Sequence, residues 1–149
     1  ALTALMAGTI VRNGRYSGET GIWSDTVLHR PRNPRAHGNL GFSCARGNSP
    51  RQAIAELQRA VRLDADYPNA HNNLGAMYCV EGRFSEAVFH LRRAVEGMPE
   101  EVQVRYNLAN ALSSQGAHRE AAGHYAEVLR LKPDFTEARL RLDQIRLRP

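Results

Sequence analysis

The sequence contains very little cysteine. Its 149 residues include only Cys44 and Cys79, and neither belongs to a C-x-x-C pair or lies near a histidine at the spacing of metal ligands. Free cysteine is among the residue types that are most often buried, so we expect both to act as small apolar residues. The cysteine pattern therefore gives no sign of a disulfide-built scaffold, and it leaves the cellular compartment open.

Lysine is almost absent as well. Lys132 is the only lysine among 20 basic residues, so nearly all of the positive charge is arginine. The formal net charge is +5 and the isoelectric point is about 9.8, a balance that invites a search for a nucleic-acid interface. However, Asp and Glu are interleaved with the arginines, and no run of five like charges occurs. We therefore expect no nucleic-acid partner and only a slight preference for anionic partners.

No apolar run approaches the roughly 20 residues that a membrane-spanning helix needs. The opening segment, residues 1–11, is apolar but too short, and it lacks both an initiator methionine and the basic region of a signal peptide. A chain that opens within such a segment is expected to be part of a longer protein.

The motifs of common catalytic and metal sites are also missing. The sequence has no G-x-S-x-G, no P-loop and no G-x-G-x-x-G. None of its six histidines belongs to an H-E-x-x-H pair or has a cysteine at zinc spacing. Carboxylates such as Glu81, Glu86, Glu100 and Glu101 are expected on solvated helix surfaces. We therefore expect that the chain by itself is no enzyme and that it holds no cofactor and no metal ion.

What the sequence does have is an internal repeat. Asn39-Leu40-Gly41 recurs as Asn73-Leu74-Gly75 and again as Asn107-Leu108-Ala109, and each step is 34 residues. Further positions keep the same step: His37 and His71; Ala53, Ala87 and Ala121; Leu57, Leu91 and Tyr125; Ala60, Ala94 and Val128; Pro99 and Pro133.

These residues resemble the tetratricopeptide repeat, a helix–turn–helix of 34 residues with the pattern W-x2-L-G-x2-Y, then A-x3-F, then P. The second repeat matches best, through Leu74, Gly75, Tyr78, Ala87 and Pro99. The tryptophan is missing from all three repeats, and its place is taken by His37, His71 and Arg105. The resemblance implies an all-α fold, a solenoid of antiparallel helix pairs that forms a right-handed superhelix. We place repeat 1 at 34–67, repeat 2 at 68–101 and repeat 3 at 102–135.

The repeated residues have physical roles in such a fold. Gly41 and Gly75 let the second helix of a repeat approach the first closely, and Ala109 does so in repeat 3. Glycines at Gly47, Gly82 and Gly116 are predicted near the turns, where a helix ends and glycine accepts the left-handed backbone conformation. Proline cannot continue a helix, so Pro99 and Pro133 are predicted to follow the ends of second helices.

Residues 1–33 are interpreted as an irregular helix pair or as a degenerate further repeat. Gly14-Arg15-Tyr16-Ser17 resembles Gly82-Arg83-Phe84-Ser85, but Glu19 replaces the small alanine expected at a tight crossing. We favour a helix from Glu19 to His29 that packs Ile22, Trp23 and Val27 on repeat 1. The segment Ala1 to Val11 is also expected to be helical.

Residues 136–149 are predicted to form a C-terminal capping helix. Ala138, Leu142 and Ile145 recur at helical spacing, and charged residues occupy the remaining positions. A single helix with one apolar stripe after the last repeat is what a solenoid needs at its end.

One column of residues indicates a ligand. In the family, the first helices of the repeats line the inner, concave face, which is the binding surface. Asn39, Asn73 and Asn107 share one position in the first helices, and an amide side chain offers both a donor and an acceptor to a peptide backbone. The column resembles the asparagine ladder in the repeat domain of O-GlcNAc transferase, which implies a peptide-binding role. The alternative is that these asparagines cap or bridge adjacent helices.

Other polar residues are expected near that column. They are Asn69, Asn72, Asn110, Arg35, Arg46, Tyr106 and Arg141. The two-carboxylate clamp of chaperone-binding family members uses Lys and Arg in the first helices. Gly38, Asn69, Asn72 and Gln103 occupy or neighbour the corresponding positions, so chaperone tails are not expected as ligands.

A second resemblance concerns the residues before repeat 1. A spaced pattern of Arg12-Asn13, Trp23, Asp25-Thr26-Val27 and Arg35-Ala36-His37 is similar to a junction in multispanning membrane proteins of the protein O-mannosyltransferase-like class. Those proteins have tetratricopeptide repeats after their last span. The resemblance implies that residues 1–11 are the tail of a span and that the repeats lie outside the cytoplasm.

Three functions therefore remain open from the sequence. The leading one is an adaptor that binds a protein or peptide of unknown identity in the concave groove, and such a free-standing adaptor would be cytoplasmic. The second is an accessory domain of a membrane glycosyltransferase that recruits acceptor proteins. The third is a self-association module, for example a homodimer.

Overall fold

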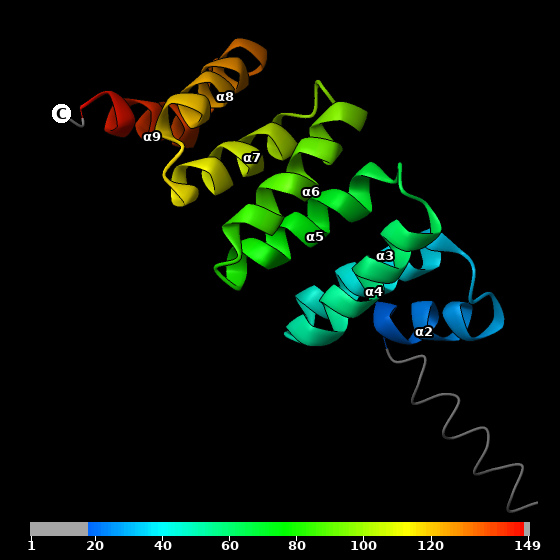
Figure 1. The fold of residues 1–149 in the computed structure, drawn as a ribbon. Helices are drawn as coiled ribbons and strands as arrows, with labels where there is room; N and C mark the ends of the chain where they lie inside the picture. The colour runs from blue at the N-terminus through cyan, green and yellow to red at the C-terminus, as the bar shows by residue number, and fades with distance from the viewer. Residues whose placement is uncertain (1–17, 148–149) are drawn as a thin grey trace, which may run out of the picture. The chain divides into compact units, whose positions relative to one another are not determined.

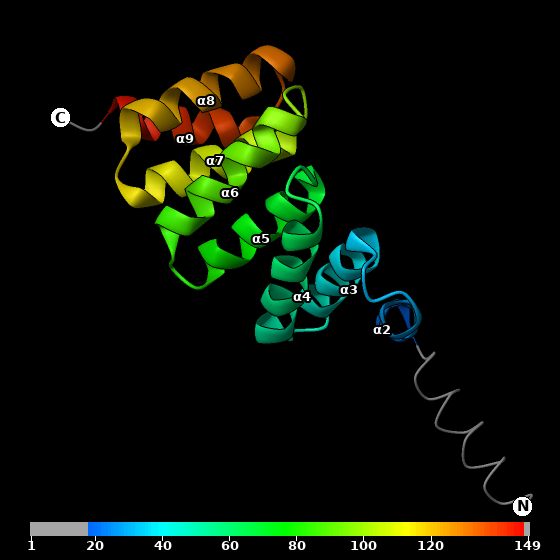
Figure 2. The ribbon, with the colours of Figure 1, turned by 45° about the vertical axis from the view of Figure 1, so that its right-hand side comes forward.

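The computed structural model describes residues 18–147, which form eight α-helices and no β-strand (Figure 1). The chain divides into two compact units, one reaching to Ala65 and the other beginning at Asp66. The N-terminal unit contains α2 (Glu19–His29), α3 (Pro34–Arg46) and α4 (Pro50–Leu63). The C-terminal unit contains α5 (Pro68–Val80), α6 (Phe84–Gly97), α7 (Val102–Gln115), α8 (His118–Leu131) and α9 (Thr136–Arg146). Each predicted repeat range holds one antiparallel helix pair: α3 with α4, α5 with α6, and α7 with α8 (Figure 2).

The helix ends keep the 34-residue step of the sequence. The first helices α3, α5, α7 and α9 begin at residues 34, 68, 102 and 136, and the helices α2, α4, α6 and α8 end at residues 29, 63, 97 and 131. At each of these four ends, the next backbone N–H donates to the carbonyl four residues earlier, as Arg30 does to Thr26. The helix α2 is therefore in phase with the second helices of the repeats.

The bounds of α2 coincide with the predicted helix, but its packing is looser than predicted. Trp23 and Val27 are half-buried, whereas Ile22 remains 51% exposed, so the predicted burial of Ile22 on repeat 1 is wrong. The helix still packs on α3, and the hydroxyl groups of Thr20 and Ser43 lie 2.6 Å apart across that contact. The helix predicted over Ala1 to Val11 falls outside the described residues.

Local chemistry explains where α3, α4 and α5 begin. Each has a proline at its first position, Pro34, Pro50 and Pro68, where the missing N–H costs nothing and the fixed φ suits a helix. At α3 the Asn33 side chain also accepts hydrogen bonds from the backbone N–H groups of Arg35 and Ala36. This arrangement satisfies two of the donors that a helix start leaves free.

Close helix crossings occur at the predicted glycines. A Cβ atom added to Gly41 would lie 2.6 Å from Cγ of Leu57, and one added to Gly75 would lie 2.6 Å from Cγ of Leu91. Ala109 is fully buried at the equivalent place in repeat 3. These positions accept only the smallest side chains, because the leucine of the second helix occupies the space that a larger residue would need.

The turns inside the repeats correct one prediction. Gly82 and Gly116 have φ of 73° and 92°, as predicted for the left-handed conformation. In repeat 1, however, Gly47 has φ of −80° and Asn48 adopts φ of 57° instead. Asn48 holds the same repeat position as Gly82 and Gly116, so the turn of repeat 1 keeps the 34-residue step and the prediction at Gly47 was one residue too early. Asparagine is one of the few residues besides glycine that enter this region readily.

The helix α9 packs on α8 through part of its predicted stripe. Ala138 and Leu142 are buried, and Ile145 is half-buried. Arg139 donates a hydrogen bond to the carbonyl oxygen of Pro133 at 2.6 Å, and Arg105 makes the equivalent bond to Pro99 one repeat earlier. The start of α9 is therefore held in the same way as the start of α7. Within residues 18–147, no helix is both long enough and apolar enough to cross a membrane.

Candidate polypeptide-binding face

Amide side chains join the two first helices of the C-terminal unit. Asn107 of α7 donates a hydrogen bond from Nδ2 to Oδ1 of Asn72 on α5, over 3.0 Å. Both side chains are half-buried. The bond joins residues 35 positions apart, one more than the 34-residue repeat. It therefore links two neighbouring repeat positions rather than the same position in two repeats.

The bond belongs to a longer chain of amides that all point in one direction. Gln103 donates from Nε2 to Oδ1 of Asn107 at 3.1 Å, and Asn72 donates from Nδ2 to Oδ1 of Asn73 at 3.4 Å. Within the described part of the chain, the amide nitrogen of Asn73 and the amide oxygen of Gln103 are the two ends left without a protein partner. We call these four residues the amide row. It offers N–H donors at one end and a carbonyl acceptor at the other.

The amide row contains no charged side chain. A neutral amide holds its hydrogen bonds at every pH from acid to base, and it does not favour an ionised ligand over a neutral one. What the row can do chemically is to exchange hydrogen bonds with a neutral partner that has both N–H and C=O groups.

Asn39, the third member of the predicted column, lies on α3 in the N-terminal unit. Its side chain is half-buried and makes no hydrogen bond with another described residue. The helix-bridging role that Asn107 has in the C-terminal unit is therefore not shared by Asn39. Helix bridging, one of the two roles that the sequence left open, is thus present at Asn107, and peptide binding by the column stays a prediction.

Two predicted groove residues are occupied by packing within repeat 3. The hydroxyl group of Tyr125 on α8 donates to Oδ1 of Asn110 at 2.6 Å, and Tyr125 is fully buried. The ring of Tyr106 lies 5.8 Å from that of Tyr125 and 4.9 Å from that of Phe135, measured between centroids. Both side chains therefore support the α7–α8 hairpin, whatever they contribute to binding.

The remaining predicted residues are exposed and scattered. Asn69 and Arg141 lie in the C-terminal unit, on α5 and α9, and Arg35 lies on α3 in the N-terminal unit. Arg46 at the end of α3 pairs with Glu19 of α2, with Nη1 and Oε2 3.3 Å apart, and its guanidinium lies over the Phe42 ring. None of these four takes part in the amide row.

Gln103 is the member of the amide row that the sequence prediction missed. It shares its repeat position with Asn69, so the sequence has a second column of amides four positions before the asparagine column. A residue and the one four positions later lie on the same face of a helix. That spacing was the signal that could have identified Gln103.

Three histidines, His37, His71 and His90, form polar pairs inside the hairpins of repeats 1 and 2. His37 Nδ1 lies 2.6 Å from Glu56 Oε2, and its Nε2 lies 2.9 Å from the Pro31 carbonyl oxygen. His71 and His90 occupy the same two positions in repeat 2. The described residues include no group of three or more side chains that could hold a metal ion.

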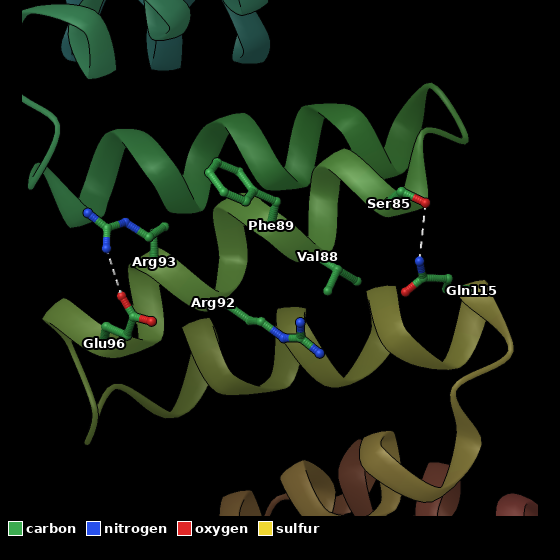
Figure 3. Close-up of a pocket in the computed structure, with 7 residues that line it drawn as sticks. All are labelled: Ser85, Val88, Phe89, Arg92, Arg93, Glu96 and Gln115. Carbon is green, nitrogen blue, oxygen red and sulfur yellow. Dashed lines mark hydrogen bonds and ion pairs between the residues drawn. The ribbon is translucent and has the colours of Figure 1, made fainter.

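A separate hollow of about 430 Å³ lies on the second-helix side of repeat 2 (Figure 3). It is lined by Ser85, Val88, Phe89, Arg92, Arg93, Glu96 and Gln115. Its two arginines are already paired: Arg93 contacts Glu96 and Asp66, and Arg92 contacts Glu120 on α8. The hollow therefore offers no unpaired positive charge to a ligand.

Comparison with protein-family models gives two matches along the chain. A model described as TPR repeat matches residues 51–80, and one described as tetratricopeptide repeat matches residues 81–134. Together they cover more than half of the 149 residues. No curated protein sequence matches the chain.

Solved structures show the same fold. The chain resembles MamA with 24% identity and a TM-score of 0.78, over 83% of this chain and 72% of that one. It resembles YrrB, described as a TPR protein with an unusual peptide-binding site, with 20% identity and a TM-score of 0.77, over 83% of this chain and 63% of that one. A Thermobaculum terrenum O-GlcNAc transferase aligns with 25% identity and a TM-score of 0.67, over 75% of this chain but only 22% of the enzyme.

The repeat, the helix pairs and these matches define an all-α solenoid protein that acts as a scaffold for protein–protein interaction. The chain belongs to the tetratricopeptide-repeat family.

Proposed function

We propose that this chain binds an extended polypeptide along the face of its first helices, with the amide row of α5 and α7 at the centre of the contact. The observation that carries this proposal is the row itself. Four amide side chains, Gln103, Asn107, Asn72 and Asn73, are half-buried or exposed on one face, and they leave a free donor and a free acceptor.

The chemistry of the row suits a peptide backbone. Each residue of an extended chain presents one N–H and one C=O, and an amide side chain pairs with either. Neighbouring helices pack roughly 8–10 Å apart, and an extended chain rises roughly 3.3 Å per residue. One asparagine per repeat would therefore meet the ligand at about every third residue, whatever its side chains are.

The neutrality of the row indicates what kind of ligand fits best. A C-terminal carboxylate or a phosphate would need Lys or Arg beside it, and the amide row has neither. The ligand is therefore an internal, extended segment that is recognised through its main chain. Asn39 holds the same repeat position on α3, and we propose it as a candidate contact of the N-terminal unit by itself. The description of YrrB as a protein with a peptide-binding site supports the proposal by analogy.

The second function, an accessory domain of a membrane glycosyltransferase, stays a prediction. Part of the junction pattern on which it rests has a structural role: the Pro31 carbonyl oxygen contacts His37, a member of the pattern. The aligned O-GlcNAc transferase supports the general idea that such repeats accompany a glycosyltransferase, and it says nothing of mannosyl transfer. The residues before Ala1 would test this function directly, because it requires apolar spans there.

The experiment for the leading function begins with a peptide array, since no ligand is known. Peptides retained by the chain are then titrated calorimetrically against the triple variant Asn39→Ala, Asn73→Ala and Asn107→Ala. We expect binding to weaken by tenfold or more, because each lost amide removes a hydrogen bond of about 1 kcal/mol. The matched control is Gln52→Ala with Arg119→Ala, two exposed positions on second helices, and it should bind like the parent. Equal affinity of triple variant and parent would contradict the proposal.

A further inference from the structure

The first helices of the C-terminal unit differ in charge. The helix α5 contains no Asp, Glu, Lys or Arg, and α7 contains one such residue, Arg105. Arg105 is half-buried, and its guanidinium donates to the carbonyl oxygen of Pro99. By contrast, α9 contains five charged residues among its eleven. The two helices that carry the amide row therefore present no charged group to a ligand, whereas the next first helix along the chain does.

The 34-residue step indicates which charges of α9 continue the face of the amide row. Arg141 holds the repeat position of Asn73 and Asn107, and Glu137 holds that of Gln103. Residues four positions apart share a face of a helix, so Glu137 and Arg141 lie on one side of α9.

The other three charged residues of α9 are placed differently. Arg139 donates to the carbonyl oxygen of Pro133 and so belongs to the start of its own helix. Asp143 and Arg146 hold repeat positions whose counterparts in α7 are buried between helices. Both are exposed on α9, the last helix of the described residues. The face of the amide row is therefore continued by two charged residues only.

Of these two, Arg141 lacks a partner. Its side chain is exposed and makes no hydrogen bond or ion pair with another described residue. Glu137 is at the spacing of a helix ion pair, but no such pair forms between the two side chains. Glu137 lies in the first turn of α9, where the positive end of the helix dipole stabilises a carboxylate. Arg141 lies in the middle of the helix and has no such compensation.

The charge of Arg141 reaches the neighbouring first helix. It opposes the rise in the pKa of Tyr125 that burial and Tyr106 cause, so its guanidinium lies close enough to act on that hydroxyl group. The hydroxyl group itself donates to Oδ1 of Asn110 on α7. The Tyr106 ring of α7 also packs against Phe135, directly before α9. Arg141 is therefore at the end of the amide-bearing face rather than apart from it.

We propose that the polypeptide bound along the amide row carries an Asp or Glu side chain that pairs with Arg141. This inference rests on the proposed function and adds a charge requirement to it. Arginine is well suited to the role, because its planar guanidinium donates two parallel hydrogen bonds to one carboxylate.

The spacing of the first helices then gives the ligand a register. Neighbouring helices pack roughly 8–10 Å apart, which matches about three residues of an extended chain. The acidic residue therefore lies about three positions from the residue that meets Asn107 and about six from the one that meets Asn73. The residues between are uncharged, since α5 and α7 offer no charged partner and a charge would lose hydration there without compensation.

The test uses the whole chain and the peptides retained on the array, each with an amidated C-terminus. Every residue of a retained peptide is replaced in turn by Glu, Gln and Lys, and binding is measured calorimetrically. We expect one position at which Glu binds about tenfold more tightly than Gln, because hydrogen bonds between two charged groups are strong. Lys should bind more weakly than Gln at that position.

Variants of the chain assign this preference to a residue. Arg141→Gln should abolish the preference for Glu, and Arg141→Glu should reverse it in favour of Lys. Both variants should bind the Gln peptide almost as the parent does. The matched control Arg146→Glu makes the same change of charge at an exposed position on another side of α9, and it should keep the preference for Glu.

The outcomes separate this inference from the function on which it rests. No charge preference at any position, or a preference for Glu that persists in Arg141→Glu, would overturn the inference. The proposed function would still stand if Asn73→Ala weakened binding of the same peptides, whereas failure to retain any peptide would overturn both. A preference for Lys that Glu137→Gln removes would assign the charge requirement to Glu137 instead. A gain seen only with a free peptide C-terminus would contradict recognition of an internal acidic side chain.

Discussion

His71 and His90 face each other inside repeat 2, with their Nδ1 atoms 2.9 Å apart and their ring centroids 5.0 Å apart. Burial, with the neighbouring His71 as the next cause, lowers the pKa of His90 to about 4, while Glu86 opposes the shift. In repeat 1 the same two positions hold His37 and Glu56, 2.6 Å apart. Repeat 2 therefore pairs two histidines where repeat 1 pairs a histidine with a carboxylate.

This difference predicts acid sensitivity of repeat 2. Unfolded histidine binds a proton near pH 6.5, whereas folded His90 does so only near pH 4. The unfolded chain thus binds more protons between these values, so stability is complete above about pH 6.5 and is lost as the pH falls toward 4. The loss from His90 is about 3 kcal/mol at most. Urea unfolding followed by circular dichroism at pH 7 and pH 4.5 measures it.

The variant His90→Gln should flatten this pH dependence, and the control His29→Gln, at an exposed position of α2, should leave it unchanged. Burial also lowers the pKa of His124 in repeat 3, with Arg105 as the next cause, so some acid sensitivity should remain in His90→Gln. If the stability of His90→Gln depends on pH as that of the parent does, the His71–His90 pair does not cause the acid sensitivity.

The close crossing in repeat 2 predicts a large effect of one methyl group. Gly75→Ala places a Cβ atom 2.6 Å from Cγ of Leu91, so we expect a loss of about 1–3 kcal/mol in the free energy of unfolding. Gly123→Ala on α8 is the control, because a Cβ atom there meets nothing within 4 Å. Alanine is a better helix former than glycine, so the control should gain about 0.5–1 kcal/mol. Denaturant unfolding that ranked the two in the opposite order would contradict the packing described for α5 and α6.

The buried hydroxyl group of Tyr125 predicts an effect at alkaline pH. Burial, with a smaller effect of Tyr106, raises the pKa of Tyr125 to about 12. Unfolded tyrosine ionises near pH 10, so the stability that the neutral phenol contributes is complete below pH 10 and is lost as the pH rises toward 12. Tyr125→Phe should remove this loss, and at pH 7 it should cost about 1 kcal/mol because Asn110 loses its donor. Thermal melts of the parent and of Tyr125→Phe at pH 7 and pH 11 measure both effects. If the two proteins lose the same stability between these pH values, the alkaline loss does not come from Tyr125.

The sequence predicted the helices of this fold well because the residues that recur every 34 positions are those that pack between helices. A glycine or alanine every 34 residues, facing a leucine or tyrosine of the next helix, indicates helix pairs and also where they cross. The left-handed residue of repeat 1 was missed because the neighbouring glycine, Gly47, was preferred to Asn48, although Asn48 holds the repeat position of Gly82 and Gly116. The exposure of Ile22 was missed because it depends on what packs on α2, which periodicity does not state.

The candidate site was only partly predictable for a similar reason. The column of asparagines is visible in the sequence, but its partners are not. Asn107 bonds to Asn72 rather than to Asn73, its counterpart one repeat earlier, because the relative rotation of α5 and α7 decides which side chains meet. That rotation comes from packing and cannot be read from spacing within one helix.

The bridging bond of Asn107 predicts different results for two single variants. Asn107→Ala removes contacts with both Asn72 and Gln103, so we expect about 1 kcal/mol less stability as well as weaker peptide binding. Asn73→Ala removes only the last acceptor of the row, so binding should weaken with almost no change in melting temperature. Calorimetric titration with scanning calorimetry separates the two effects. An equal loss of stability in both variants would indicate that the amide row only stabilises the fold.

The most direct measurement is nuclear magnetic resonance of the asparagine and glutamine side-chain NH2 groups during titration with a peptide from the array. The account predicts that the signals of Asn73, Asn72 and Gln103 shift with peptide concentration, while that of Gln52 on α4 stays in place. Shifts confined to Gln115 and the backbone of α6, around the hollow of repeat 2, would place the ligand on the opposite side and contradict the proposed binding face.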